Sequence, residues 1–265
     1  MANDIRDIIF ATVRDNEYTA HLSAEQDGVV SGVARLQAVL EQRQIKYQFF
    51  KKDSDFVAAG EVIFTLSGTP KDIAVAEEFA IGMLSKPSGI ATAARKAVSM
   101  AGSMRIVSGA WKKAPPEIKL IVREAVTHGG ASFRIVDVPF LYLDKNFVRM
   151  LGGIKETLAA VGAMPELKVI QVKGETGNVA AEAVLAAECG AGIIMVDTGN
   201  IEDLRKVSAS LKETGYRSKV QLAFAKGIAL QNIEKLQAED IDILDIGMQI
   251  IDAPLLDMKL DVVGS

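Results

Sequence analysis

Residues 167–197 read LKVIQVKGETGNVAAEAVLAAECGAGIIMVD and contain the pattern that decides the fold. Two short apolar runs, 167–172 and 192–196, have the composition of buried β-strands, and a helical segment separates them. Strands that alternate with helices pair in parallel, because the helix carries the chain back to the same edge of the sheet. The stretch therefore predicts a strand–helix–strand unit.

The same rhythm extends outward from this stretch. Further apolar runs, each followed by a helical segment, occur at 104–107, 133–135, 219–224 and 241–246. Aromatic residues make up only 6% of the chain, which is typical of stacked α/β layers rather than of a β-sandwich. These observations predict an α/β protein whose C-terminal part is a parallel sheet or barrel.

The N-terminal part shows a mixed pattern instead. Its expected strands and helices lie, in chain order, at 17–24 (strand), 32–40 (helix), 47–50 and 61–66 (strands), and 70–83 and 89–101 (helices). We therefore expect an N-terminal domain over 1–103, with strands near 17–68 and helices over 70–101. A second domain is expected over 104–250, and a tail over 251–265.

Composition limits the classes of partner. The chain has 265 residues, 49% of them hydrophobic, and a net charge of −4 without a basic stripe, which argues against nucleic acid. No apolar run reaches the roughly 20 residues that span a bilayer, and residues 1–6 do not resemble a signal peptide. The single cysteine, Cys189, suits a reducing compartment and is expected to be inert packing. We expect a cytoplasmic protein with no membrane partner.

Parallel strands present their functional groups at their C-terminal ends. After the first run, Lys112 and Lys113 on a proline-stiffened loop are candidates to hold a phosphate or carboxylate; the alternative is a solvated loop. After the last run, Gly247 would let backbone amides approach a phosphate. Arg134 stands in an apolar run, where it would meet either a ligand anion or an acid such as Asp137 or Asp144.

Three further strand ends carry charge. Asp197 would accept ligand hydroxyls or cap the next helix. Lys173 and Lys226 each follow an apolar strand, where a lysine binds an anion, forms an imine with a carbonyl when desolvated, or simply points to solvent. His21 and His128 are the only histidines and Cys189 the only cysteine, so a Cys/His zinc cluster is excluded and no protein-held metal is expected.

Several motifs resemble successive landmarks of the quinolinate phosphoribosyltransferase family, also called carboxylating nicotinate-nucleotide pyrophosphorylases. In chain order they are Asp27–Gly32, Ala59–Ile63, Leu84–Thr92, Lys112–Pro116, Met195–Asp197 and Gly227–Ile233. The string Ser88-Gly89-Ile90-Ala91-Thr92 is the most specific, and the likeness covers about residues 20–263.

This resemblance implies a type II phosphoribosyltransferase-like fold, in which an N-terminal α/β sandwich domain precedes an incomplete parallel α/β barrel. It also implies a homodimer or a dimer-based homo-oligomer, a small anionic metabolite as ligand, and a transferase of pyridine nucleotide metabolism. The tail is expected to return to the N-terminal domain. Mg²⁺ is implied if phosphoribosyl pyrophosphate is the donor.

The chain also departs from the family pattern. Glu78 stands where an arginine is expected, Lys145 lies in an Asp-Lys-Asn-Phe string in place of Lys-Asp-Asn-His, and Gln171 replaces an acid of the fifth-strand motif. Lys226-Gly227 stands in the family's Ser-Gly-Gly phosphate loop. Removing a cation from an anion site, or inserting Glu78, weakens binding of a charged group by about a few kcal/mol. The resemblance implies that losing the fifth-strand acids undermines the metal and ribose contacts of phosphoribosyl pyrophosphate. A changed substrate is therefore expected.

Three functional hypotheses follow. The first is phosphoribosyl transfer to a small anionic heteroaromatic acceptor other than quinolinate. In it, Asp197, Lys113 and Lys226 are the catalytic candidates, and the binding candidates are Lys112, Lys113, Arg134, Lys145, Lys173, Lys226, Gly227 and Gly247. The second is a lyase or decarboxylase that forms an imine at Lys173 or Lys226. The third is a non-catalytic paralogue that binds a small anion.

Overall fold

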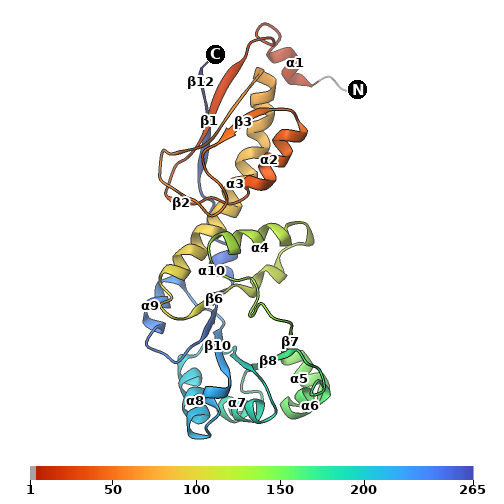
Figure 1. Ribbon diagram of the computed structural model, residues 1–265, viewed down its shortest axis with the longest axis vertical. Helices are drawn as coiled ribbons and strands as arrows, with labels where there is room; N and C mark the ends of the chain where they lie inside the picture. The colour runs from red at the N-terminus through yellow and green to blue at the C-terminus, as the bar shows by residue number, and fades with distance from the viewer. Residues whose placement is uncertain (1–3, 265) are drawn as a thin grey trace. The chain divides into compact units, whose positions relative to one another are not determined.

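The computed structural model describes residues 4–264, which form two compact units (Figure 1). The first contains the chain up to Arg95, the segment Ala114–Gly130 and the chain from Ile250 onward. The second contains Lys96–Lys113 and Ala131–Gln249. The predicted boundaries after 103 and 250 stay a prediction. In the described part of the chain, no helix is both long enough and apolar enough to span a membrane.

The first unit is an antiparallel sheet packed against helices. Its four strands run in the order β12 (Met258–Gly264), β1 (Tyr18–Ala24), β5 (Val62–Gly68) and β3 (Lys46–Phe49). The smaller elements are α1 (Ile5–Ile9), the pair β2 (Gly28–Val29) and β4 (Phe56–Val57), η2 (Pro116–Ile118) and α4 (Lys119–His128). The chain's last strand, β12, pairs with β1 in this sheet, so the C-terminal segment belongs to the first unit.

Two helices supply the other layer of the first unit, α2 (Val33–Gln42) and α3 (Pro70–Ser99). Leu22 and Phe64 from the sheet and Leu36 and Leu84 from the helices are fully buried in one core. Burying each such side chain contributes about 1.5–3 kcal/mol, so this core is what joins the sheet to its helices.

Helix α3 is continuous from Pro70 to Ser99, so the prediction of two separate helices is wrong. Pro87 lies inside it, where proline removes one backbone hydrogen bond and favours a break. The carbonyl four residues earlier, that of Met83, faces Gly32, where a Cβ atom would lie 2.4 Å from the carbonyl oxygen. Close tertiary packing of this kind keeps the helix continuous where local preference favours a break.

The second unit is a six-stranded parallel sheet with helices between its strands. The strand order is β6 (Arg105–Val107), β11 (Ile243–Asp245), β10 (Gln221–Ala225), β9 (Ile193–Val196), β8 (Leu167–Val172) and β7 (Phe140–Leu143). The helices are η1 (Gly109–Lys113), α5 (Lys145–Leu151), α6 (Ile154–Ala160), α7 (Val179–Glu188), α8 (Ile201–Glu213), η3 (Arg217–Lys219), η4 (Leu230–Asn232), α9 (Ile233–Leu236) and α10 (Met248–Ile251).

The inner face of this sheet carries one shared core. Val107, Val169, Ile193, Ala223 and Ile243 come from five different strands and pack into a single cluster. The end strands β6 and β7 are not paired with each other, so the barrel is incomplete. The predicted fold class, an α/β sandwich domain followed by an incomplete parallel barrel, is confirmed.

One predicted strand is wrong. Residues 133–135 form a bend, and the end strand is β7 at Phe140–Leu143 instead. Ile135 and Val136 are nevertheless buried in the barrel core. The apolar run therefore indicated burial correctly but not a strand. Irregular backbone next to the end strands can bury apolar side chains as well.

Candidate functional site

A cavity of about 590 Å³ opens at the carboxyl ends of the barrel strands. Five lysines and three aspartates line it, together with backbone from the loops that follow the strands. The predicted site residues among its lining are Lys112, Lys113, Lys145, Lys173, Asp197, Lys226, Gly227 and Gly247. We call it the mouth cavity.

The most closely bonded group in the mouth cavity is the Asp197 carboxylate. Lys173 Nζ lies 2.6 Å from Asp197 Oδ2 and 3.0 Å from its backbone oxygen, and Gln171 Nε2 donates to the same Oδ2 at 2.6 Å. The next helix, α8, is capped by Asn200, whose side chain accepts from Glu202 N. The alternative in which Asp197 caps that helix is therefore wrong.

The Lys173 backbone is held by a buried acid on the following helix. Glu182 Oε2 accepts hydrogen bonds from Lys173 N at 3.1 Å and Gly174 N at 2.8 Å, and Glu182 Oε1 accepts from the amide and hydroxyl of Thr176. Glu182 is only 5% exposed. This carboxylate fixes the loop that carries the Lys173 side chain toward Asp197.

A second acid of the mouth cavity, Asp245, ends β11. Burial raises the pKa of its carboxyl above the usual range, and the hydrogen bond from Gly109 N, at 3.0 Å to Oδ1, partly opposes that shift. Tyr142 lies in the same lining, and burial, with smaller contributions from Asp245, Asp197 and Asp144, raises the pKa of its phenol. Lys112 Nζ lies 5.5 Å from the centre of the Tyr142 ring. The Lys112 ammonium, the Tyr142 phenol and the Asp245 carboxyl therefore all line the mouth cavity.

Four lysines of the mouth cavity form no ion pair with any described residue between 4 and 264. They are Lys112, Lys113, Lys145 and Lys226, and all four are exposed. Ammonium groups that converge on one cavity without carboxylate partners attract an anion, because the field is focused in the low-dielectric cleft. The mouth cavity therefore has the electrostatics of a site for a phosphate or carboxylate.

The loop after β10 has an unusual backbone. Lys226 and Gly227 both have positive φ, 83° and 72°, and such angles are rare for a residue with a side chain. The backbone of Gly199 lies against this loop, since a Cβ atom at Gly199 would lie 2.5 Å from the Lys226 oxygen. Strained positions of this kind persist where surrounding structure holds them and are frequent at binding sites.

Arg134 lies outside the mouth cavity. Its guanidinium is exposed and lies 5.3 Å from the centre of the Phe140 ring, and within residues 4–264 it forms no ion pair. The predicted ion pairs with Asp137 and Asp144 are absent there, and Asp144 instead caps α5 by accepting from Asn146 N and Phe147 N. The stacking contact satisfies the cation at the surface.

Sequence reasoning missed several functional groups. The sequence identifies Gln171 only as the replacement of an acid, although its side-chain amide bonds both Asp197 and the backbone of Lys145. The sequence pattern also does not single out Asp245 or Tyr142, which both line the mouth cavity. The available signal for Asp245 is its position as the last residue of a buried strand, two residues before Gly247.

The donor set of the mouth cavity does not fit a magnesium ion held by protein side chains alone. Mg²⁺ takes carboxylate oxygens at about 2.0–2.1 Å and retains several waters. Asp197 Oδ2 already accepts two N–H donors, one of them a cation, and no group of three or more metal-ligating side chains occurs in the described chain. The Lys173 ammonium instead supplies the positive charge next to Asp197 Oδ2.

Comparison with known proteins identifies the family. The model of the quinolinate phosphoribosyl transferase N-terminal domain matches residues 7–88, and that of the C-terminal domain matches residues 90–261. A probable nicotinate-nucleotide pyrophosphorylase [carboxylating] of Archaeoglobus fulgidus is 29% identical over 248 residues, 92% of this chain and 93% of the relative. The nicotinate-nucleotide pyrophosphorylase [carboxylating] of Homo sapiens is 28% identical, covering 91% of this chain and 81% of its own length.

Solved structures show the same fold. The nicotinate-nucleotide pyrophosphorylase from Francisella tularensis superposes with a TM-score of 0.84 at 22% identity, over 99% of this chain and 91% of that one. The corresponding protein from Ehrlichia chaffeensis gives 0.85 at 17% identity, over 99% and 93%. Since the two family models together cover nearly the whole chain, this protein belongs to the quinolinate phosphoribosyl transferase family and is an enzyme of the phosphoribosyltransferase type.

Proposed function

We propose that the protein transfers a phosphoribosyl group from phosphoribosyl pyrophosphate to a small anionic heteroaromatic acceptor other than quinolinate. The observation that carries this proposal is the convergence of five lysines with Asp197 at the strand ends of a barrel of this family. The curated relatives are named nicotinate-nucleotide pyrophosphorylases, which supports a pyridine- or azole-like acid as the acceptor.

Within this proposal, the free ammonium groups bind the donor. Lys112 and Lys113 on η1 and Lys226 after β10 would hold phosphate oxygens, and Gly227 and Gly247 leave room for backbone N–H groups to approach them. The Lys173 ammonium, fixed on Asp197, adds positive charge where a metal would otherwise be needed. Donor binding is therefore expected to depend weakly on Mg²⁺.

The reaction itself requires stabilisation of positive charge on the ribose as the pyrophosphate leaves. The Asp197 carboxylate faces the mouth cavity and has one oxygen, Oδ1, without a hydrogen-bond donor among the described residues. A carboxylate held in a fixed position stabilises a developing cation without having to reorganise. Asp197 would take this part, and Lys113 and Lys226 would stabilise the leaving phosphate.

The acceptor is expected to be less acidic than the dicarboxylate quinolinate. Glu78 replaces an expected arginine and pairs with Arg6, and Phe147 replaces an expected histidine. Each replacement removes a cation that would bind a carboxylate, which costs about 1.5–3 kcal/mol per charged hydrogen bond lost. A monocarboxylate acceptor fits the remaining cations better than a dicarboxylate.

The imine alternative has less support. Lys173 is in an ion pair, which uses its protonated form, and Lys226 is exposed rather than desolvated. A lysine nucleophile needs a neutral amine, which a buried apolar pocket favours. Borohydride with keto acids would reveal this chemistry by a mass gain at either lysine.

A homodimer is part of the proposal. Phe147, Met150 and Leu151 on α5 expose 45%, 74% and 41% of their surface, and their spacing of three and four residues places them on one face of the helix, which supports an interface there. Sedimentation of the purified chain would test it, and a concentration-independent monomer would contradict it.

The decisive test of the function is a binding titration with phosphoribosyl pyrophosphate, with and without Mg²⁺, followed by product analysis. We expect saturable heat in both conditions and a nucleotide product with monocarboxylate pyridine or azole acids. Absence of binding at millimolar donor would contradict the proposal. Turnover of quinolinate at the rate of the best acceptor would contradict the proposed substrate class.

A further inference from the structure

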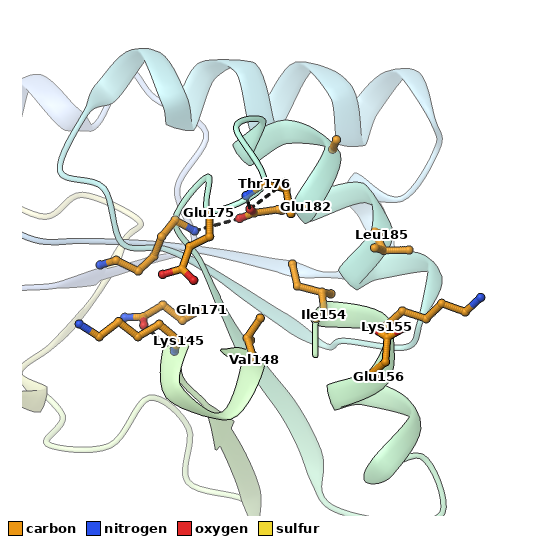
Figure 2. Close-up of a pocket in the computed structure, with 13 residues that line it drawn as sticks. Lys145, Val148, Ile154, Lys155, Glu156, Gln171, Glu175, Thr176, Glu182 and Leu185 are labelled. Atoms are coloured by element: carbon orange, nitrogen blue, oxygen red, sulfur yellow. Dashed lines mark hydrogen bonds between the residues drawn. The ribbon is translucent and has the colours of Figure 1, made fainter. Parts of the chain in front are cut away.

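A second cavity, of about 380 Å³, lies beside the mouth cavity between α5, α6, α7 and the end of β8 (Figure 2). Its volume is within the range of pockets that bind small molecules. Lys145, Gln171 and Lys173 line both cavities, so the two meet at these residues. We call the second one the side cavity.

The body of the side cavity is apolar. Val148 from α5, Ile154 from α6 and Leu185 from α7 form its walls, with Ala181 at the edge of α7. Figure 2 shows Val148 and Ile154 between Lys145 and Gln171 on one side and Lys155 and Glu156 on the other, with Leu185 above Lys155. Because three helices supply the walls, the cavity is formed before a ligand arrives.

Two of the three acids that line the side cavity, Glu182 and Glu175, are already bonded. The third, Glu156, lies beside Lys155, away from Lys145 and Gln171 (Figure 2). Glu182 accepts the four hydrogen bonds from the 173–176 loop, two of which involve Thr176, and Glu175 Oε1 and Oε2 accept from Arg149. These carboxylates therefore do not make the cavity a cation site. Carboxylate oxygens that already accept hydrogen bonds from the protein have few lone pairs left to bind a cation.

The end shared with the mouth cavity is cationic. Lys145 Nζ forms no ion pair with a residue of the described chain, and Lys173 Nζ directs two of its three N–H groups at Asp197 and keeps one. A ligand that enters from the mouth thus meets ammonium groups first and apolar walls beyond them. That polarity matches an acid with an apolar body.

We propose that the side cavity binds the apolar body of an aromatic carboxylate whose carboxylate lies at Lys145 and Lys173. The inference deepens the proposed function, on which it rests, by assigning an apolar substituent to the acceptor. Binding itself needs only the two cavities, so it is measured without the donor.

The probes are benzoate and 4-tert-butylbenzoate, titrated calorimetrically into the full chain. Each buried CH₂ contributes about 0.8 kcal/mol, about fourfold in affinity. We therefore expect 4-tert-butylbenzoate to bind at least about tenfold more tightly than benzoate. Equal dissociation constants for the two acids would overturn the proposal.

Two matched variants locate the effect. Ala181→Leu adds a side chain at an exposed helix position that lines the side cavity, and Ala159→Leu makes the same change at an exposed position of α6 that lines neither cavity. The tenfold preference should disappear in the first and persist in the second. A preference that survives in A181L, or is lost equally in A159L, would overturn the assignment.

The two proposals fail in different ways. Inorganic pyrophosphate should bind A181L as it binds the unmodified chain, which shows that the mouth cavity is intact. If no acceptor yields a nucleotide but the tenfold preference stands and is lost in A181L, the proposed function fails and the aromatic acid site remains. If donor binding and turnover stand but the two acids bind equally, the side cavity assignment alone fails.

Discussion

Lys173 Nζ lies 2.6 Å from Asp197 Oδ2, and the two residues directly follow neighbouring strands whose last residues, Val172 and Val196, are paired in register. The pairing of β8 with β9 therefore brings Lys173 and Asp197 side by side, whatever rotamers their side chains adopt. Both side chains are about four-fifths buried, at 21% and 20% exposure. At that depth, removing one partner leaves a charge that water only partly compensates.

Lys173→Met should weaken inorganic pyrophosphate binding by about tenfold to a hundredfold, because one charge-assisted contact is lost and Asp197 is left to repel the anion. Calorimetry measures the dissociation constant directly. Lys173→Arg retains the charge and should keep most of the affinity. The matched control is Lys155→Met, which removes an exposed lysine that lines only the side cavity. Equal affinity in K173M and the unmodified chain would contradict the role.

Asp245→Asn should change how stability depends on pH. Because the folded-state pKa of Asp245 is raised, its protonated form favours the folded state below the usual value near 3.8, and this contribution is lost as the pH rises through the raised pKa. The Asn side chain does not ionise, so the variant does not lose this stability as the pH rises. Its melting temperature should therefore rise relative to the unmodified chain as the pH increases from about 4 to about 8.

The control for that experiment is Asp252→Asn, which changes an exposed carboxyl. Its melting temperature should follow the unmodified chain across the same pH range. A constant difference between D245N and the unmodified chain would show that burial of Asp245 does not disfavour its charge.

Glu182→Gln should loosen the loop that carries Lys173. Glu182 accepts from the amides of Lys173, Gly174 and Thr176, and these N–H groups have no other acceptor among residues 4–264. A glutamine has one acceptor oxygen, and its NH₂ group would face at least one of these donors. The free energy of unfolding should fall by about 2–3 kcal/mol, and amide exchange should accelerate at residues 173–176.

Glu175→Gln is the matched change on the same loop. Glu175 pairs with the largely exposed Arg149, and such surface pairs contribute about 0–1 kcal/mol. Denaturant titration of both variants would decide the point. An E175Q loss as large as that of E182Q would contradict the assignment of loop order to Glu182.

Ser31 and His128 should be energetically coupled within the first unit. Ser31 Oγ lies 2.8 Å from His128 Nδ1, and Ser31 is fully buried. A double-mutant cycle with Ser31→Ala and His128→Ala should give a coupling of about 1 kcal/mol. The same cycle with His21→Ala should give a coupling near zero, and a coupling near zero for His128 as well would contradict the bond.

The sequence by itself determined the barrel and most of its mouth. The runs at 167–172, 192–196, 219–224 and 241–246 become β8, β9, β10 and β11 because buried parallel strands are apolar on both faces. Their C-terminal ends meet at one edge, so Lys173, Asp197 and Lys226 were found by position alone. The local sequence pattern is enough to predict a strand when the strand is apolar and also buried on both faces.

Only the tertiary structure decided how those residues interact. The ion pair of Lys173 with Asp197 depends on the register of two strands, which the sequence pattern does not specify. The cap of α8 by Asn200 depends on the backbone conformation between residues 197 and 202, and the pattern left it open. Local preference also predicted a break at Pro87. Packing between segments far apart in the chain set the ion pair and the continuity of α3, because contact energies between such segments exceed the propensity differences of single residues.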